Sequence, residues 1–326
     1  MTAPLRLALL GCADIAARRT LPALLRNPSL RLTALASRTE ARAKEFAHDF
    51  GGTPVADYQE LLEREDVDAV YVCLPSMVHA EWTERALLAD KHVLVEKPLA
   101  TTHADAARLF RLAERRGLVL LENFMFLHHG QHHRVAGLLA DGVLGEIRAV
   151  SAAFTIPPRP EGDTRYDPAA GGGNGVYPLR AALRFLGPGL TPAGVVLRHS
   201  ARYGVDVSGA ALLHRCDGTP AHIRFGMEHH YRSWYEIQGS AGTLSVDHVF
   251  TTTATHPPTL RLTIGTERTN IRLPAEDHFE AILGFFEAAV RGAEGTARPL
   301  TVLGRESQEQ ARLVETLRET SVHVTV

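Results

Sequence analysis

Residues 90–99, DKHVLVEKPL, place an acid and an amine directly after an apolar run. Residues 92–95 have the composition of a strand buried on both faces, so Glu96 and Lys97 would stand at its carboxyl end, where open α/β sheets bind ligands. Only three of the 35 lysines and arginines are lysines, and Lys97 is the one that follows a buried strand. Arginine keeps its proton, whereas a partly buried lysine can release one. We therefore expect Lys97 to be a proton donor; a strand-end ion pair with Glu96 is the alternative.

The composition limits the class of protein. A chain of 326 residues that is 45% hydrophobic can bury a large core, and its length favours two domains. A net charge of −2 gives no reason to expect a nucleic acid or an anionic membrane as partner. No apolar stretch approaches the roughly 20 residues of a membrane-spanning helix, and the first apolar run is too short for a signal peptide. Three widely spaced cysteines without a CxxC pair are typical of a reducing compartment, so we expect a cytoplasmic protein.

The first apolar strand is followed at once by GCADIA, a relaxed form of the dinucleotide-binding pattern G-x-G-x-x-G/A. Gly11 would make the tight turn, the small Ala13 would let a pyrophosphate approach the backbone, and Ala16 would allow close packing of helix on strand. Arg18 and Arg19 add cations near the phosphates. A plain strand-to-helix turn is the alternative.

The end of the second strand, residues 30–36, indicates which dinucleotide is bound. NAD-specific folds usually carry an acid here to hold the ribose 2′-hydroxyl, but this chain has Ser37 and Arg38. A hydroxyl and a guanidinium suit a 2′-phosphate, which favours NADP. Ser37 and Glu40 also match a capping box for a helix over residues 41–50, and both interpretations can hold together.

Strands and helices alternate with short connections as far as residue 123. The strand over 68–74 is followed by His79, which would lie at the ligand-facing edge and start a helix through residue 88; a capping histidine is the alternative. A helix over 103–116 and a strand over 119–123 complete the pattern. Alternation of this kind predicts a doubly wound parallel sheet.

The pattern changes after residue 123. A helix is expected over 124–139, and it carries four histidines, His128, His129, His132 and His133. Histidines four positions apart can bind a metal, but no acid stands at ligand spacing, so we expect no metal. Eight strand-like segments follow, at 147–156, 194–203, 209–216, 222–228, 235–239, 243–249, 259–264 and 269–273, and two amphipathic helices, 278–291 and 306–320, close the chain.

The predicted fold class is thus α/β, with a Rossmann domain over 1–123 that binds NADP. An α+β domain over 124–326 would hold a large, mostly antiparallel open sheet. With too few helices to cover both faces of that sheet, we expect a homo-dimer or homo-tetramer that buries one face.

The motifs resemble those of a known family. GCADIA, the SRT strand end, LPSMVHAEW, DKHVLVEKP and the α+β second half are similar to the Gfo/Idh/MocA oxidoreductases over essentially the full chain. Within that family, GCADIAARR, LENFMFLHH, FTIPP, GVYPLRAA and FGMEH resemble the sugar 3-ketoreductases of deoxysugar and antibiotic biosynthesis. The resemblance implies NADPH-dependent reduction of the C3 ketone of a dTDP-linked 3,4-diketo-2,6-dideoxyhexose. It leaves open another NADP-dependent sugar, inositol or diol dehydrogenase, or a non-catalytic NADP sensor.

The resemblance also implies roles for residues. Lys97 would be catalytic with Tyr177, in GVYP, as its partner, and both would contact the dTDP-sugar together with Arg165, in DTRYD. The segment before Tyr177, GGGNG, departs from the family pattern because it is shorter and lacks an aspartate. The residues expected to line the cofactor NADP(H) are Gly11, Cys12, Ala13, Asp14, Ile15, Ala16, Arg18, Arg19, Ser37, Arg38, Tyr58, Leu74, His79 and Glu96.

Overall fold

The computed structural model describes residues 3–167, 175–293 and 299–326, and the chain divides into two compact units. The first unit is Met1–Met125 with Phe279–Ser307, and the second is Phe126–His278 with Gln308–Val326. The predicted second domain contains everything after residue 123, whereas the first unit of the structure also includes Phe279–Ser307. The glycines before Tyr177 lie largely outside the described residues.

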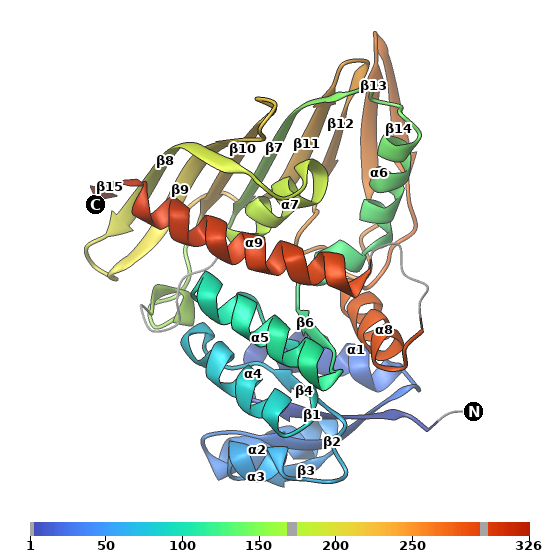
Figure 1. Ribbon diagram of the computed structural model, residues 1–326, viewed down its shortest axis with the longest axis vertical. Coiled ribbons are helices and arrows are strands. Elements are labelled where there is room, and N and C mark those ends of the chain that lie inside the picture. The colour runs from blue at the N-terminus through green and yellow to red at the C-terminus, as the bar shows by residue number, and fades with distance from the viewer. Residues whose placement is uncertain (1–2, 168–174, 294–298) are drawn as a thin grey trace. The chain divides into compact units, whose positions relative to one another are not determined.

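The first unit is built on a six-stranded parallel sheet in the order β3-β2-β1-β4-β5-β6 (Figure 1). This is the order of dinucleotide-binding folds, with a reversal of direction between β1 and β4. The expected doubly wound sheet is therefore confirmed. Its strands are β1 (Leu5–Leu10), β2 (Leu30–Ala36), β3 (Thr53–Val55), β4 (Ala69–Val72), β5 (His92–Val95) and β6 (Leu120–Glu122).

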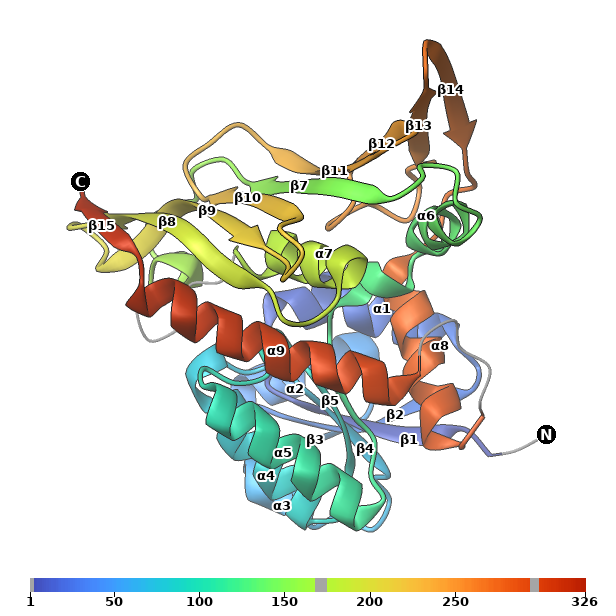
Figure 2. The ribbon, with the colours of Figure 1, turned by 45° about the horizontal axis from the view of Figure 1, so that its top comes forward.

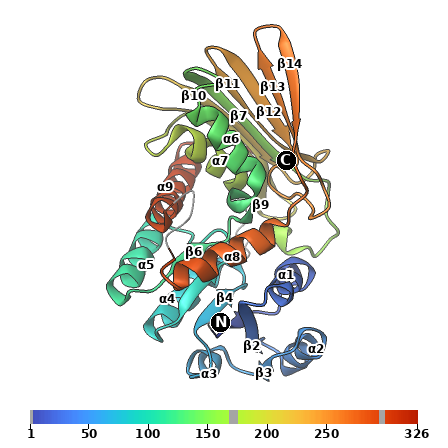
Figure 3. The same cartoon turned by 90° about the vertical axis from the view of Figure 1, so that its right-hand side faces the viewer.

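Helices cover both faces of this sheet (Figure 3). A π-helical turn η1 (Ala16–Thr20) runs into α1 (Leu21–Arg26), which lies with α2 (Glu40–Phe50) on one face. The opposite face is covered by α4 (His79–Leu88) and α5 (His103–Arg116). The unit also contains α3 (Tyr58–Leu62), the 3₁₀ turn η2 (Ser76–Val78) and, but for its first residue, α8 (His278–Val290). The helix α9 (Leu300–Glu319) belongs to this unit as far as Ser307 and to the second unit from Gln308 on.

The helix α5 shows how the sequence sets these elements. Thr102 caps its start, with the side-chain oxygen accepting from the Asp105 amide at 3.1 Å. Its apolar residues recur at helical spacing and are buried. Gly117 ends it with φ +65°, a left-handed conformation in which glycine is strongly preferred.

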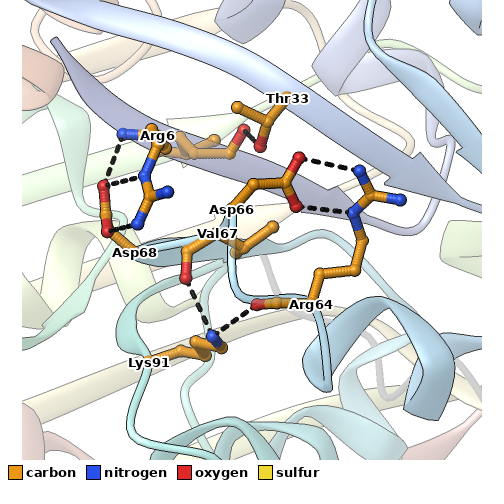
Figure 4. A network of polar contacts seen from close by, with 8 residues as sticks. Arg6, Thr33, Arg64, Asp66, Val67, Asp68 and Lys91 are labelled. Carbon is orange, nitrogen blue, oxygen red and sulfur yellow. Dashed lines mark hydrogen bonds and ion pairs between the residues drawn. The ribbon is translucent and has the colours of Figure 1, made fainter.

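Polar side chains form a network at the amino ends of β1, β4 and β5 (Figure 4). The Arg6 guanidinium donates two hydrogen bonds to the Asp68 carboxylate, from Nε to Oδ2 at 2.9 Å and from Nη2 to Oδ1 at 2.6 Å. These bonds hold the pKa of the Asp68 carboxyl below its ordinary value. Lys91 Nζ donates to the carbonyl oxygens of Arg64 and Val67, both at 2.8 Å. The network ties the starts of three strands together.

The second unit is built on a nine-stranded sheet in the order β14-β13-β12-β11-β7-β10-β9-β8-β15 (Figure 2). The expectation of a mostly antiparallel sheet is confirmed; the pairs β7–β10 and β8–β15 are parallel. All eight predicted strands are present, and β15 was not predicted. The strands are β7 (Ile147–Thr155), β8 (Thr191–Ser200), β9 (Val205–His214), β10 (Pro220–Gly226), β11 (Arg232–Gly239), β12 (Gly242–Asp247), β13 (Thr259–Ile264), β14 (Glu267–Arg272) and β15 (Val322–Thr325).

The helices of this unit differ from the expected ones. The predicted helix over 124–139 is a 3₁₀ turn, η3 (Met125–His128), followed by α6 (Gly130–Ala140), because His129 interrupts the helix and caps α6. The helix α7 (Val176–Leu186) was not predicted and packs on β7 and β10. The last helix, α9 (Leu300–Glu319), starts six residues before the predicted position. No helix in the described part of the chain is long and apolar enough to cross a membrane.

Candidate active site

The glycine loop after β1 has the conformation that the pattern predicts. Gly11 has φ +103°, and a Cβ atom there would lie 2.4 Å from the Cys73 carbonyl oxygen, so only glycine fits. The Gly11 amide donates to the Ala36 carbonyl at 3.0 Å, which joins the ends of β1 and β2. Burial raises the pKa of the Cys12 thiol to about 11, so this cysteine is neutral at physiological pH.

Arg42 of α2 braces this loop and was missed by the sequence analysis. Its guanidinium donates to the Cys12 carbonyl at 3.5 Å and to the Asp14 carboxylate at 3.3 Å, and it lies over the Phe46 ring. Arg42 stands 28 positions beyond Asp14, so no local pattern could link the two. The sequence offered one local signal for the position of Arg42: Phe46 follows it by one helical turn, where an aromatic ring can pack against the guanidinium.

The end of β2 carries the two residues expected to select the cofactor. Ser37 is buried and accepts from the Thr39 amide at 3.5 Å, while Arg38 is exposed. The predicted capping box is wrong: Thr39 is the N-cap of α2, in an extended conformation, and no side chain caps the helix. Tyr58 lies near Arg38, whose charge opposes the rise in the Tyr58 pKa that burial produces. The sequence-predicted residues of β2 and α3 therefore meet here.

His79 begins α4 as predicted, but its ring is buried and committed to the backbone. Its two nitrogens lie 2.7 Å from the Leu74 carbonyl oxygen and 2.8 Å from the Pro98 carbonyl oxygen. These carbonyls follow β4 and β5. His79 thus braces two loops at the carboxyl edge of the sheet, and its direct contact with a cofactor stays a prediction.

Glu96 and Lys97 follow β5 at the same edge, both half-buried. Glu96 Oε1 accepts from Tyr71 OH at 2.6 Å and from Asn123 Nδ2 at 2.5 Å. The Glu96 carboxylate is therefore held by two neutral donors, so the alternative in which Glu96 pairs with Lys97 is not what the described residues show. Neither Tyr71 nor Asn123 was predicted as part of the site.

Tyr177 belongs to the second unit, in the first turn of α7, where its ring is buried. It lies in an aromatic cluster, with ring centroids 5.0 Å from Phe154, 5.7 Å from Phe250 and 6.0 Å from Phe126. Such packing fixes the direction of the tyrosine ring. The structure thus places Tyr177 on a rigid element.

Arg165 lies in a 3₁₀ turn, η4 (Thr164–Tyr166), and its guanidinium is partly exposed. Its Nη1 contacts both oxygens of Asp163 at 3.0 and 3.1 Å, and Asp163 also accepts from Arg159 at 3.0 Å. Burial raises the Asp163 pKa, but hydrogen bonds from both arginines outweigh this, so the net shift is downward. Two guanidiniums therefore share the Asp163 carboxylate, and Glu161 of the same segment pairs with Arg202 at 2.9 Å.

The four-histidine run has hydrogen-bonding roles in the second unit. Burial lowers the pKa of His132 well below its ordinary value, so the ring is neutral. Its Nε2 donates to the Val249 carbonyl at 3.2 Å, and its Nδ1 accepts from Tyr235 OH at 2.9 Å. His129 Nδ1 accepts from the Gln131 amide at the start of α6. The described residues contain no group of three or more His, Cys, Asp or Glu side chains arranged to hold a metal.

Comparison with known proteins identifies the family. The model for the oxidoreductase family with an NAD-binding Rossmann fold matches residues 5–124, and that for the GFO/IDH/MocA C-terminal domain matches residues 132–245. The chain belongs to the Gfo/Idh/MocA oxidoreductase family. The resemblance stated from the motifs is therefore confirmed.

Similar proteins of this family carry a more specific name. A dTDP-3,4-didehydro-2,6-dideoxy-alpha-D-glucose 3-reductase from Actinomadura kijaniata is 50% identical over 97% of this chain and 95% of its own. The enzyme of that name from Streptomyces antibioticus is 51% identical over 95% of both chains. The crystal structure of a 3-ketoreductase from Actinomadura kijaniata with NADP and TDP-benzene superposes with a TM-score of 0.93, at 49% identity over 99% of both chains.

The carboxyl edge of the first unit fits the cofactor that this family uses. The glycine loop brings backbone close to where a pyrophosphate would lie, and its Gly11 cannot be replaced without a clash. Arg19 and Arg38 are exposed and make no ion pair with any residue of the described ranges. A neutral Ser37 with a guanidinium beside it suits a 2′-phosphate better than a 2′-hydroxyl.

Proposed function

We propose that this protein is a sugar 3-ketoreductase that uses NADPH to reduce the C3 ketone of dTDP-3,4-didehydro-2,6-dideoxy-α-D-glucose. NADPH supplies a hydride to the C3 carbon, and a side chain supplies a proton to the C3 oxygen, which gives the secondary alcohol and NADP⁺. The identity of about 50% over nearly the whole chain to enzymes of that name carries the proposal.

The cofactor residues divide into three tasks. The glycine loop, Gly11 to Ala16, receives the pyrophosphate, with Arg18 and Arg19 beside it. Ser37 and Arg38 bind the 2′-phosphate, and Tyr58 lies beside them. The remaining contacts of the proposed site come from the segments that follow β4 and β5 and from the start of α4, namely Leu74, Glu96 and His79.

Lys97 and Tyr177 share the supply of the proton. Negative charge grows on the C3 oxygen as hydride reaches the carbon, so a nearby acid must donate to it. A free lysine, with a pKa of about 10.4, is a poor donor at neutral pH and needs burial or neighbouring cations to become a better one. Tyr177 can donate directly while the Lys97 ammonium stabilises the tyrosinate. Arg165, which pairs with Asp163, contacts the dTDP-sugar.

The direct test is an assay with the didehydro sugar nucleotide. Because this diketone is unstable, it is generated in place from its dTDP-sugar precursor by the dehydratase that forms it. We expect NADPH consumption matched by a product whose C3 carries hydrogen from labelled NADPH, detected by mass spectrometry. NADPH consumption only with free sugars, inositol or diols would assign the protein to another activity of the family. No consumption with any carbonyl substrate, despite NADPH binding, would support a sensor.

One face of the nine-stranded sheet carries exposed residues on β8, β9, β10 and β15, and we propose that a second copy of the chain covers them in a homo-dimer or homo-tetramer. Residues of neighbouring strands lie opposite one another in a row that crosses most of the sheet. From β15 to β11 the row is Val322, Val196, Ala210, Arg224, Ala153 of β7 and Trp234. Val196 and Val322 are exposed, at 49% and 62%. A mixed row of this kind suits a two-fold interface in which the same face meets itself.

Light scattering tests the assembly. We expect a mass of two or four chains at micromolar concentration, and Val196→Arg should lower it by placing like charges against each other across the two-fold axis. A monomer in the wild type would contradict the assembly and leave the proposed reaction untouched.

The three cysteines are free, which is consistent with our prediction of a cytoplasmic enzyme.

A further inference from the structure

The Glu96 carboxylate is held from two different strands. Tyr71 OH, on β4, and Asn123 Nδ2, directly after β6, both donate to it. Tyr71 OH in turn accepts from Thr20 Oγ1 of η1 at 3.2 Å. Thr20, Tyr71 and Asn123 are all buried, with at most 1% of each exposed. Donors on packed strands leave the carboxylate little freedom to rotate.

Both donors use the same oxygen of Glu96. A carboxylate can accept about four hydrogen bonds, two on each oxygen. Tyr71 and Asn123 take the places on Oε1, and Oε2 accepts no hydrogen bond from any residue in the part of the chain that the structure describes. The arrangement therefore fixes the direction of Oε2 and keeps it available as an acceptor.

Asn123 supports a role beyond packing. Its Oδ1 is buried and has no hydrogen-bond partner among the described residues. An unpaired buried amide oxygen is unfavourable, so an apolar side chain would suit packing better at this position. Only the Nδ2 end of the amide can face the carboxylate, because an oxygen there would repel Oε1. The donation from Nδ2 to Glu96 is what an apolar side chain could not supply.

The position of Glu96 in the sheet identifies the part of the cofactor that it faces. In this strand order the dinucleotide lies across the reversal between β1 and β4, with its pyrophosphate at the loop after β1. The end of β2 serves the adenosine ribose, so the side of β4, β5 and β6 serves the nicotinamide half. Glu96 directly follows β5 on that side. Ribose hydroxyls donate and a carboxylate oxygen accepts, so the two groups are complementary.

We propose that Tyr71 and Asn123 are positioning residues that hold Glu96 so that Oε2 accepts a hydrogen bond from a ribose hydroxyl of the nicotinamide half. This inference rests on the proposed function, since it requires NADP(H) as the cofactor. The residue after Glu96 is Lys97, so the same contact would hold the nicotinamide ring close to the proposed proton donor.

Binding of the whole cofactor and of one half tests the inference. The probes are NADPH and adenosine 2′,5′-bisphosphate, which has the 2′-phosphate but no nicotinamide nucleoside. Tyr71→Phe removes a single oxygen and Asn123→Leu removes the amide at similar volume. Each should raise the dissociation constant for NADPH about tenfold, as loss of a hydrogen bond to a charged group does, and leave that for the bisphosphate unchanged.

Two further variants sharpen the comparison. Glu96→Gln keeps the size of the side chain but replaces one carboxylate oxygen with an NH₂ group, so it should show the same selective loss. Thr20→Val removes the donor to Tyr71 OH and leaves both bonds to Glu96, so it should bind both probes within about twofold of the wild type. Thermal unfolding is measured for all four variants. If one variant does not fold, the remaining folded variants provide the test.

The results distinguish a failure of this inference from a failure of the proposed function. A wild type that binds the bisphosphate and NADPH, with Tyr71→Phe and Asn123→Leu unchanged toward both, overturns the inference and leaves the proposed function standing. An equal loss for both probes overturns it as well, because a general distortion is not selective for one half. A wild type that binds neither probe contradicts the proposed function itself.

Discussion

The two ends of the six-stranded sheet use similar cations in opposite ways. At the amino ends of the strands, Arg6 is paired with Asp68, and Lys91 donates to two backbone carbonyls. At the carboxyl ends, Arg19 and Arg38 form no ion pair with any described residue, and Arg18 reaches only the Asp14 carbonyl, at 3.3 Å. Both sets of residues lie in or next to elements of the same parallel sheet, but at its opposite ends.

The difference separates charges that stabilise the fold from charges that are available to a ligand. A cation that already has a carboxylate or two carbonyls as partners gains little from an added anion. Cations left without partners repel one another and gain from a phosphate. The cations at the amino ends of the strands thus stabilise the fold, and those at the carboxyl ends are available to bind an anionic cofactor.

The largest expected effect is at the carboxyl end, in the reaction itself. Lys97→Met keeps the apolar stem and removes the amine, so NADPH binding and folding should survive while turnover falls about 10²–10⁴-fold. Lys97→Arg should restore little, because arginine does not release its proton. Steady-state reduction of the didehydro sugar nucleotide measures this, with NADPH fluorescence titration alongside.

Tyr177→Phe tells the two possible donors apart. It should lower turnover less than Lys97→Met if lysine is the main donor, and as much if tyrosine is. Near-normal turnover in Lys97→Met would remove Lys97 from the reaction and weaken the contrast between the two ends.

The next effect concerns the choice of cofactor. We expect the wild type to prefer NADPH, and Arg38→Ala should weaken NADPH binding about 10–100-fold, the usual range for a hydrogen bond to a charged group, while leaving NADH unchanged. KM values for both cofactors provide the measurement. Equal KM values in the wild type would show that the cations at the end of β2 do not select a 2′-phosphate.

A smaller effect is expected for the lysine at the amino end. Lys91→Met leaves the carbonyls of Arg64 and Val67 without their donor, which should lower the free energy of unfolding by about 1–2 kcal/mol. Turnover of the folded enzyme should not change. Lys44→Met is the matched control, since its pair with Glu40 is exposed and should contribute at most about 0.5 kcal/mol. A loss of turnover in Lys91→Met would mean that the two ends are not independent.

The smallest effect is a pH dependence of stability at the amino end. Arg6 lowers the folded-state pKa of Asp68, so this pair contributes fully above the unfolded pKa of about 3.9 and is lost as the pH falls through the folded value. Because the pair is partly exposed, Asp68→Asn should cost only about 1 kcal/mol at pH 7. Urea unfolding between pH 7 and pH 2 should show the gap between wild type and variant closing toward pH 2. A gap that stays constant with pH would exclude an ionic origin.

Several features of the site follow from local patterns and could be predicted. The turn at Gly11 and the buried strand before Glu96 depend on residues close together in the chain, where steric limits and apolar periodicity act directly. The missed helix α7 had no such signal. It follows a run of glycines and contains Pro178 in its first turn, so the segment resembles a loop until its buried face is seen. The capping box failed because Thr39, and not Ser37, stands at the helix start.

The sequence by itself determined the parallel sheet, the glycine loop and the amine at the end of β5, because each arises from neighbouring residues. Only the tertiary structure decided what surrounds Glu96. Tyr71 and Asn123 lie 25 and 27 positions away from it in the chain, and they reach one oxygen because β4 and β6 flank β5. Hydrogen bonds between strands depend on which strands become neighbours and in what register, and no local periodicity records that choice.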